Sequence, residues 1–470
     1  MAERELCLQG LAQVSQLIQR RQVSPVEVVQ SCLQRIEAVG GKLNAFITLL
    51  ADEALAGAKQ AEIDITRGHY LGPLHGIPVG LKDIFWTKGV RTTNGSKVFA
   101  QWVPSEDATT VKLLKKAGVI IIGKTNLHEF AYGPTNVNPH FGPVRNPWDP
   151  ERIPGGSSGG SGAAVAAGLC YMATGTDTGG SIRNPASLCG TVGLKPSYGL
   201  VSRYGVMALS WSLDHMGPLT RTVEDTALVM NAIAGHDAHD PASAQVPIPD
   251  YTKALDRRVR GLRLGVIKEY MEIEMNPEVR RAVEEALDTL KGEGVSVQEV
   301  SIPPVRHAFG ISSAIMMSEA SSCHEHTLQT RAKDLGADVR ARLEMGRFIP
   351  AIDYVKAQRA RGVLKREVLK TYEQVDLLVT PTVPILAPRI GEETIFFEGK
   401  YENVRGPLVL FTRLYNVTGQ PAISIPCGFS TSGLPIGLQL AGRPFGEETV
   451  LKVAHAYEQA TDWHLRHPNL

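Results

Sequence analysis

The sequence has no long hydrophobic run and almost no net charge. Its longest apolar stretch, around residues 163–173, is much shorter than the about 20 residues that a membrane-spanning helix needs. We therefore expect no transmembrane helix and no membrane partner. Lys and Arg total 49 against 48 Asp and Glu, which gives a net charge of +1. This balance provides no overall attraction to nucleic acid, so no direct nucleic-acid binding is expected.

Cysteine is sparse and never clustered. Six cysteines are spread over 470 residues, and no two are spaced as CxxC. This predicts reduced, buried thiols rather than a disulfide framework or a metal site. The first residues are charged and no long apolar stretch follows them, so we expect no signal peptide. These features favour a cytoplasmic protein.

Apolar periodicity alternates between helical and strand-like segments. Strands are predicted at 77–83, 119–122, 263–267, 377–379 and 422–425, and helices at 25–36, 53–62, 109–117, 161–169, 221–235, 277–293 and within 308–374. Strands that alternate with helices predict one large α/β domain whose sheet is covered by helices on both faces. The Pro-rich segment 240–251 is expected to be a surface excursion.

Glycine is concentrated where a catalytic loop could form. Eleven of the 46 glycines fall between Gly155 and Gly193, in a region that also contains the runs GGSSGGSG and TDTGGSIR. In the second run Ser181 follows two glycines, so its hydroxyl is unobstructed and the N–H groups of residues 178–181 could converge on one point. A serine needs a base, and no histidine lies in these runs. Lys82 follows an apolar strand, so burial could lower its pKa and make it that base.

Several apparent motifs fail on physical grounds. Residues 118–125 satisfy the P-loop pattern, but their Val and Ile side chains predict a buried strand. Residues 156–160 satisfy GxSxG without the preceding strand that a nucleophile elbow requires. His128-Glu129 begins a zincin motif whose second histidine position is Tyr132, and His324 and His326 lie on opposite sides of a predicted helix. We expect no metal site.

The motifs together resemble the amidase signature family of serine hydrolases. The resemblance rests on GGSSGGSGAAVAAG, GTDTGGSIRNPAS and CGTVGLKPSYG between Gly155 and Gly199, with GIPVGLKDIF upstream and PAISIPCG and PIGLQ near the C-terminus. Residues 240–400 resemble the family only loosely. The resemblance implies a single domain with a central mixed β-sheet, 1–65 as N-terminal helices, 66–235 as the catalytic core and about 300–375 as a helical insert over the substrate.

The resemblance also implies a Ser-Ser-Lys triad and no cofactor. Ser181 corresponds to the acylated nucleophile, Ser157 to the relay serine that follows a cis peptide bond, and Lys82 to the base. The N–H groups of Thr178, Gly179, Gly180 and Ser181 correspond to the oxyanion hole. Ser158 is expected to cap the following helix, and Asp177 and Arg183 are expected to form a structural ion pair.

The substrate pocket is less clearly marked. Tyr132 and Asn136 lie in a segment that resembles a family loop near the nucleophile, and Trp211 follows a matched stretch. We predict that these three residues contact a small-molecule amide substrate, with ordinary packing as the alternative for each.

Three functions follow from the resemblance. The first is a free-standing amidase that hydrolyses a small amide, aryl amide, ester or carbamate through an acyl-enzyme. The second is the A subunit of glutamyl-tRNA amidotransferase, which works with a second kind of chain. Residues 353–358 match that relative, and Arg361 could bind a carboxylate, but residues 321–326 replace its Tyr-Gly pattern. The third, a non-enzymatic scaffold, is disfavoured because all three triad residues are present. The sequence leaves open whether the chain forms a homodimer.

Overall fold

The computed structural model describes residues 6–256 and 258–470. Its centre is an eleven-stranded sheet with the order β1-β3-β2-β4-β6-β5-β12-β13-β9-β7-β8. The strands of this sheet are β1 (Phe46–Leu49), β2 (Pro78–Lys82), β3 (Ile120–Thr125), β4 (Met172–Asp177), β5 (Val192–Lys195), β6 (His215–Thr220), β7 (Arg263–Ile267), β8 (Ser296–Val300), β9 (Leu377–Pro381), β12 (Ala422–Phe429) and β13 (Pro435–Ala441). A separate hairpin pairs β10 (Thr394–Phe397) with β11 (Lys400–Asn403).

The sheet is mixed, as the resemblance implied. β2 runs parallel to both β3 and β4, whereas β4, β6, β5, β12, β13 and β9 pair antiparallel in turn. Every residue of β2, β4, β6, β9 and β13 is buried. Because both faces of these strands are covered, polar side chains placed on them enter the protein interior.

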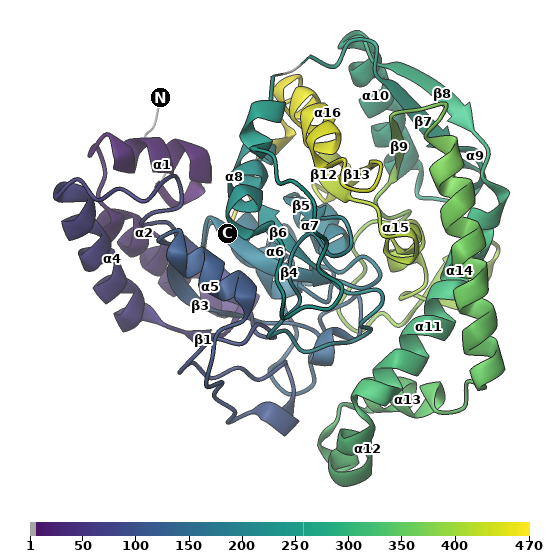
Figure 1. The fold of residues 1–470 in the computed structure, drawn as a ribbon, viewed down its shortest axis with the longest axis horizontal. Coiled ribbons are helices and arrows are strands. Elements are labelled where there is room, and N and C mark those ends of the chain that lie inside the picture. The colour runs from purple at the N-terminus through teal and green to yellow at the C-terminus, as the bar shows by residue number, and fades with distance from the viewer. Residues whose placement is uncertain (1–5, 257) are drawn as a thin grey trace.

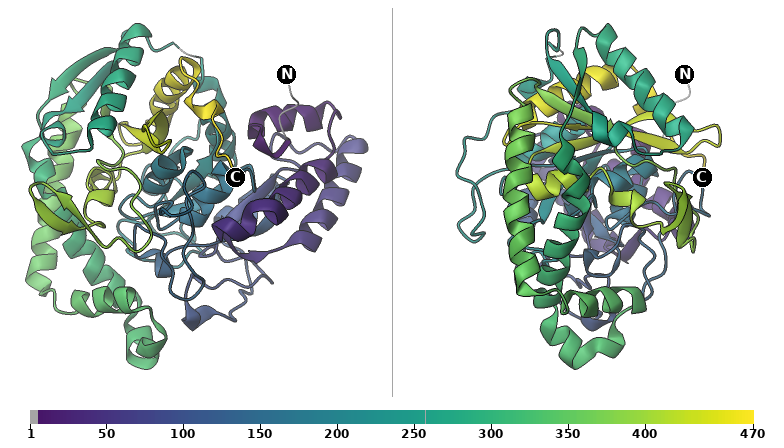
Figure 2. Two further views of the ribbon diagram at one scale, coloured as in Figure 1. Left: turned by 180° about the vertical axis from the view of Figure 1, so that it is seen from behind. Right: turned by 90° about the vertical axis from the view of Figure 1, so that its right-hand side faces the viewer.

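Helices flank the sheet on both sides (Figures 1 and 2). They are α1 (Leu11–Gln19), α2 (Pro25–Arg35), α3 (Gly41–Leu43), α4 (Ala51–Thr66), α5 (Thr109–Lys116), α6 (Gly159–Ala166), α7 (Arg183–Cys189), α8 (Val223–Ile233), α9 (Lys268–Met271), α10 (Pro277–Gly292), α11 (Ala308–Cys323), α12 (Glu325–Arg331), α13 (Ala337–Gly346), α14 (Ala351–Thr371), α15 (Arg413–Thr418) and α16 (Glu447–Gln459). The two helices that carry the glycine-rich motifs, α6 and α7, pack directly against the sheet.

The predicted helical region 308–374 consists of four helices. The breaks fall between Cys323 and Glu325, at residues 332–336 and at Pro350, which cannot continue a preceding helix. α11 packs against α13, α14 and α15, and the group extends from the sheet toward α12 at the far end of the molecule (Figure 1). The insert thereby reaches α15, which begins next to Thr412, a residue bonded to the loop before Ser181.

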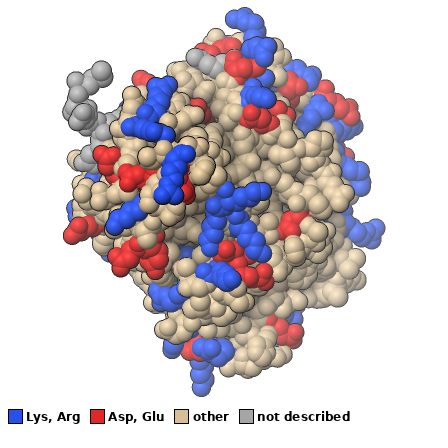
Figure 3. All heavy atoms as spheres, turned by 60° about the vertical axis from the view of Figure 1, so that its left-hand side comes forward, with Lys and Arg blue, Asp and Glu red and all other residues tan. Residues whose placement is uncertain are grey.

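Charges are mixed over the surface. Figure 3 shows Lys and Arg interspersed with Asp and Glu over the face in view, which agrees with the balanced composition. Within the described ranges, no helix is both long enough and apolar enough to cross a membrane.

Candidate active site

The strand β2 carries Lys82 into the protein interior. Lys82 is fully buried, and its backbone N–H donates to Thr174 Oγ1 on the neighbouring strand β4 at 2.9 Å. Its Nζ lies 2.8 Å from Ser157 Oγ, 2.8 Å from Ser158 Oγ and 2.7 Å from Thr176 Oγ1. The amine is therefore surrounded by three hydroxyl groups, which can either donate to it or accept from it.

This environment disfavours the protonated amine. Burial lowers the pKa of Lys82 well below its usual range, and the more distant carboxylates of Asp177 and Asp214 only partly oppose that effect. Within the described residues, Lys82 forms no ion pair. A neutral amine among hydroxyl groups has the character of a general base.

The first glycine-rich run brings Ser157 and Ser158 to this amine. The Gly156–Ser157 peptide bond is cis, as the resemblance implied. Gly156 is required because a Cβ there would lie 2.8 Å from the backbone N of Asn136 and 2.9 Å from the carbonyl oxygen of Gly133. The expectation that Ser158 caps α6 is wrong: it occupies the N-cap position, but its hydroxyl contacts Lys82 instead of a helix N–H. The Ser158 hydroxyl therefore bonds the Lys82 amine in preference to the backbone of α6.

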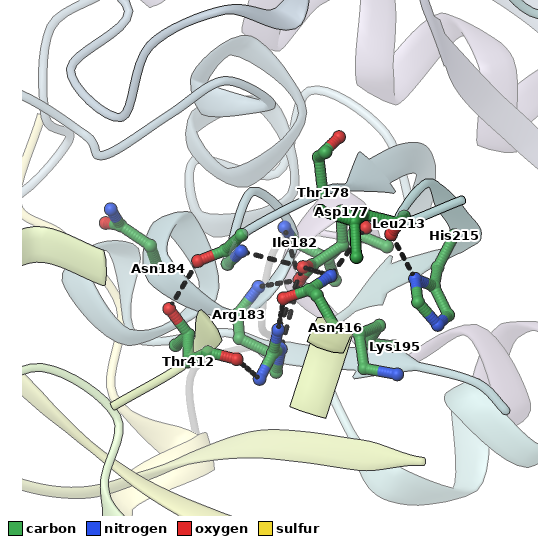
Figure 4. A network of polar contacts seen from close by, with 12 residues as sticks. Asp177, Thr178, Ile182, Arg183, Asn184, Lys195, Leu213, His215, Thr412 and Asn416 are labelled. Carbon is green, nitrogen blue, oxygen red and sulfur yellow. Dashed lines mark hydrogen bonds and ion pairs between the residues drawn. The ribbon is translucent and has the colours of Figure 1, made fainter. Parts of the chain in front are cut away.

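The second run is fixed by a buried ion pair. The Asp177 carboxylate accepts hydrogen bonds from the Arg183 guanidinium at 2.9 and 3.0 Å and from Asn416 Nδ2 at 2.8 Å (Figure 4). Burial alone would raise the pKa of Asp177, but Arg183 and these hydrogen bonds hold it well below its usual range. The predicted structural ion pair is confirmed.

The same carboxylate shapes the expected oxyanion loop. Asp177 Oδ1 accepts from the backbone N–H of Gly180 at 2.7 Å, so this one of the four expected oxyanion donors is already engaged. Gly180 has φ +133, and a Cβ there would collide with the Thr412 side chain. Thr412 Oγ1 donates to the carbonyl oxygen of Gly179 at 2.6 Å, and Thr178 Oγ1 donates to Asp214 at 2.6 Å. Both bonds hold the loop in place.

Ser181 lies where this loop meets the Ser157–Ser158 run. Its carbonyl oxygen accepts from the Ser158 N–H at 3.3 Å, and it is partly exposed to the cavity beside it. In the described part of the chain, Ser181 Oγ has no hydrogen-bond partner, and the contact between the Ser157 and Ser181 hydroxyls is not formed. The Ser181 hydroxyl is thus available to a substrate. Ser157 stands between it and Lys82 in the expected triad.

The cavity beside Ser181 has an empty volume of about 520 Å³, counting the part open to solvent. Its lining residues are Ala131, Tyr132, Gly133, Pro134, Thr178, Gly179, Ser181, Leu209, Met316, Arg342, Arg405, Val409 and Arg413. Met316 and Arg342 come from α11 and α13, so the helical insert contributes to the wall of this cavity.

The three predicted substrate-contacting residues differ in their position relative to the cavity. Tyr132 lines the cavity. Asn136 does not: it is fully buried, and its Oδ1 accepts from the Gly159 N–H at 2.9 Å, so it supports the glycine-rich loop instead. Trp211 is 44% exposed and lies outside the cavity lining, where its carbonyl oxygen accepts from Tyr198. Local sequence could not place Trp211, because the turn around it is set by distant contacts.

Other site residues were not predicted from the sequence. Thr176 is the first residue of TDTGGSIR. Because side chains alternate between the two faces of a strand, its position on β4 could have predicted that its side chain lies beside Lys82. Thr412, Arg413 and Asn416 come from a segment more than 220 residues downstream with no motif that marks it. Arg342 lies in the loosely matched insert, so only the structure reveals it.

The rejected motifs are structural. The P-loop-like run forms β3, and Lys124 within it donates to Phe85 O, Thr87 and Thr92 and pairs with Asp83 at 3.7 Å. His128 lies 3.2 Å from Asp338. Among the residues that the structure describes, no group of three or more His, Cys, Asp or Glu could hold a metal ion.

The chain is similar to known proteins over nearly its whole length. The family model "Amidase" matches residues 27–451. The chain is 44% identical to the A subunit of the glutamyl-tRNA(Gln) amidotransferase of Moorella thermoacetica, over 97% of this chain and 98% of the relative. It is 46% identical to an amidase of Pseudomonas putida, over 98% and 97% of the two chains.

A solved structure has the same fold along nearly the whole chain. It comes from a vestigial protein complex that bears on the evolutionary origins of an s-triazine catabolic enzyme, with TM-score 0.92, 36% identity and coverage of 96% of this chain and 98% of that one. With the family model, the relatives and this structure in agreement, the chain belongs to the amidase signature family, whose enzymes act on carbon–nitrogen bonds.

Proposed function

We propose that this protein hydrolyses an amide through an acyl-enzyme on Ser181. The observation that carries the proposal is the amine of Lys82, buried without a carboxylate partner, 2.8 Å from Ser157 and beside the loop that bears Ser181. A hydroxyl needs a base to become a good nucleophile, and Lys82 is the base that this interior offers.

The contact between Lys82 and Ser157 provides one step of the proposed proton path, and a transfer from Ser181 to Ser157 provides the other. Neutral Lys82 accepts the proton of Ser157 as Ser157 accepts that of Ser181, and Ser181 Oγ attacks the amide carbon. The proton returns by the same path to the leaving nitrogen, the C–N bond breaks, and the acyl group remains on Ser181 as an ester. Water attacks the ester with the same relay and releases the carboxylic acid. The path requires the Ser157 and Ser181 hydroxyls to come within hydrogen-bond distance when the substrate binds.

The backbone of residues 178–181 supports the charge that develops on the amide oxygen. Because the Gly180 N–H donates to Asp177, the N–H groups of Thr178, Gly179 and Ser181 are our candidates for oxyanion donors. Each such donor typically contributes about 3–4 kcal/mol in the transition state. Asp177 then acts indirectly, by holding the loop.

Replacing Ser181 tests the nucleophile. We expect Ser181→Ala to abolish amide hydrolysis and to remove covalent labelling by a fluorophosphonate, with an unchanged unfolding midpoint. Ser187→Ala is the matched control, because that buried hydroxyl on α7 has no hydrogen-bond partner among the described residues. Retention of more than a tenth of wild-type turnover by Ser181→Ala, or labelling at another serine, would refute the assignment.

Two substrates deserve direct comparison. The names of most of the similar relatives favour glutamine, hydrolysed by one chain of a glutamyl-tRNA(Gln) amidotransferase together with its partner chains. The Pseudomonas putida relative, whose printed name is amidase, supports a free-standing small-molecule amidase, which fewer of the similar relatives favour. Arg361, the expected carboxylate ligand, donates to the carbonyl oxygens of Val417 and Ser212 and lies outside the cavity lining. Ammonia release by the purified chain from glutamine, against cleavage of an aryl amide, separates the two.

A further inference from the structure

The cavity beside Ser181 has a cationic wall. Among its described lining residues, Arg342, Arg405 and Arg413 are the charged ones, and none is Asp or Glu. The carboxylate beside this wall, Asp338, is shared: it accepts from Arg342 at 2.9 Å, from Arg405 at 2.7 Å and lies 3.2 Å from His128. Asp338 is thus shared by two of the three guanidinium groups, and Arg413 has no ion-pair partner among the described residues.

Arg413 is the arginine nearest the nucleophile loop. Its Nε lies 3.6 Å from where a Cβ on Gly179 would be, so it stands against the expected oxyanion backbone. Its Nη1 donates to Ser313 Oγ at 2.6 Å, and its guanidinium carbon lies 4.3 Å from the ring centre of Phe309. Its Nε is buried without an acceptor, and within the described residues Arg413 forms no ion pair.

Arg342 also has buried N–H groups without acceptors. It lies over the ring of Tyr132, with its guanidinium carbon 4.7 Å from the ring centre. Its Nη2 donates to the Tyr132 carbonyl oxygen and to Asp338, but its Nε and Nη1 are buried without acceptors. The Tyr132 hydroxyl is also buried without a partner. Four unpaired polar groups from three residues thus border one cavity.

The chemistry of these unpaired donors indicates which ligand would bind them. A buried N–H without an acceptor is costly, and a charged one more so. A guanidinium matches a carboxylate, which offers several acceptor sites in one plane. Burial lowers the pKa of Arg413 to about 10, so its positive charge persists at neutral pH. Packing alone does not explain why three guanidinium groups gather beside Ser181 when two of them share one carboxylate, Asp338.

We propose that the substrate is a small amide that carries a carboxylate and no ammonium group, and that Arg413 and Arg342 bind this carboxylate with the Tyr132 hydroxyl. The proposal rests on the proposed hydrolysis at Ser181 and names the substrate class of that site. Monoamides of short dicarboxylic acids have this chemistry.

The absence of an ammonium follows from the same charges. An α-ammonium would need an acceptor, but the carboxylate beside the wall, Asp338, is already shared by three cationic or potentially cationic side chains. Glutamine differs from glutaramate only by that ammonium. Glutaramate differs from pentanamide by its carboxylate. The three compounds therefore separate the two halves of the proposal.

The experiment measures kcat/KM for succinamate, glutaramate and adipamate against butanamide, pentanamide and hexanamide, with glutamine included. In the wild-type protein we expect the best carboxylated amide to exceed its neutral match, and glutaramate to exceed glutamine, by about tenfold or more. Equal or better turnover of the neutral amides would overturn the proposal. Equal or better turnover of glutamine would overturn its second half.

Substitutions locate the effect. Arg413→Met and Arg342→Met should each lower kcat/KM for the carboxylated amide by about tenfold or more and leave the neutral amide within about threefold. Arg413→Lys keeps the charge and should retain part of the preference. Arg340→Met, on α13 but 46% exposed and paired with Glu344, is the matched control and should change neither substrate. An equal loss for both substrates in the Arg413 and Arg342 variants would show a structural role only.

A binding measurement separates this proposal from the hydrolytic one. Calorimetry on the full-length Ser181→Ala variant should detect glutaramate, bound at least about tenfold more tightly than pentanamide. If the variant binds glutaramate selectively while the wild-type protein hydrolyses no amide, the hydrolytic proposal fails and the carboxylate site stands. If neither compound binds selectively, the carboxylate site is refuted whatever the turnover.

Discussion

Three lysines are fully buried in the described part of the chain, and the atoms around each amine determine its chemistry. Lys124 pairs with Asp83, and its pKa is lowered by burial only to about 8. Lys195 donates to the carbonyl oxygens of Pro196 and Gln420, and carbonyl oxygens can only accept. Among these three, only the Lys82 amine contacts hydroxyl groups without a carboxylate or carbonyl oxygen, and hydroxyl groups can pair with it in either protonation state. That difference qualifies Lys82 as a proton acceptor.

The pH dependence of hydrolysis should report the Lys82 amine. Burial lowers its pKa, and only the neutral form can accept the relayed proton, so kcat/KM should rise with pH along a limb whose apparent pKa lies below the usual lysine value of about 10.4. Lys82→Arg keeps a charged group that cannot deprotonate, and we expect it to lose about 10²–10⁴-fold in rate. Rate profiles from pH 5 to 11 provide the measurement.

A Lys→Arg substitution at an exposed position is the control for Lys82→Arg. Lys97→Arg, at an amine whose side chain is 64% exposed, should keep both the rate and the limb. If Lys82→Arg retained the same rising limb, the titrating group would be elsewhere and the relay would be wrong.

Long motifs in short segments led to the prediction of Lys82, Ser157 and Ser181, and the structure places Lys82 and Ser157 in contact and Ser181 on the adjoining loop. The surroundings of these residues were harder to predict. Asn136 and Trp211 were assigned from neighbouring positions in the sequence, and the structure uses Asn136 to support Gly159 and leaves Trp211 at the surface. Sequence proximity does not determine which way a loop side chain points.

Among the secondary-structure elements, local periodicity predicted those whose pattern is self-contained. The helices α5 and α10 and the strands β3 and β7 agree with the predicted positions within a few residues. The strands β4 and β6 were missed because their sequences, MATGTD and HMGPLT, contain Gly, Pro and polar residues. They are strands because they pair with each other along their whole length, a contact that local sequence does not encode.

The close approach of α13 to α11 should position Arg342. Gly346 ends α13 where a Cβ would collide with the carbonyl oxygen of Met317 and the side chain of Ser321 on α11. We expect Gly346→Ala to lower the free energy of unfolding by about 1–3 kcal/mol. Because Arg342 lies one turn earlier, kcat/KM for a carboxylated amide should fall more than that for its neutral match.

Another glycine of the same helix pair provides the control. Gly310 lies in α11, and a Cβ there would meet nothing within 4 Å. Gly310→Ala should therefore stabilise the helix by up to about 1 kcal/mol and leave the kinetics unchanged. Urea titrations and the two-substrate assay test both variants, and an equal stability of Gly346→Ala and wild type would contradict the packing argument.

At the scale of the whole molecule, the two halves of the chain complete one site. β12 enters the sheet beside β5, so the C-terminal strands extend the sheet that the first 220 residues begin. Asn416 and Thr412 then hold Asp177 and Gly179 across more than 230 residues of sequence (Figure 4). The family resemblance predicted a single α/β domain, but not that the nucleophile loop depends on its far end.

This dependence predicts how the chain tolerates cutting. The segment 241–249 is irregular and only partly buried, so a protease site inserted after Gln245 should allow cleavage without loss of amide hydrolysis, because the sheet keeps the two pieces together. The isolated fragment 1–256 lacks Thr412 and Asn416 and also β12, one of the two strands that pair with β5, so we expect it to be inactive and to unfold without a cooperative transition. Activity, fluorophosphonate labelling and circular dichroism of the cleaved protein and of the fragment provide the test. A fragment that labels at Ser181 at the wild-type rate would show that the C-terminal half does not hold the loop.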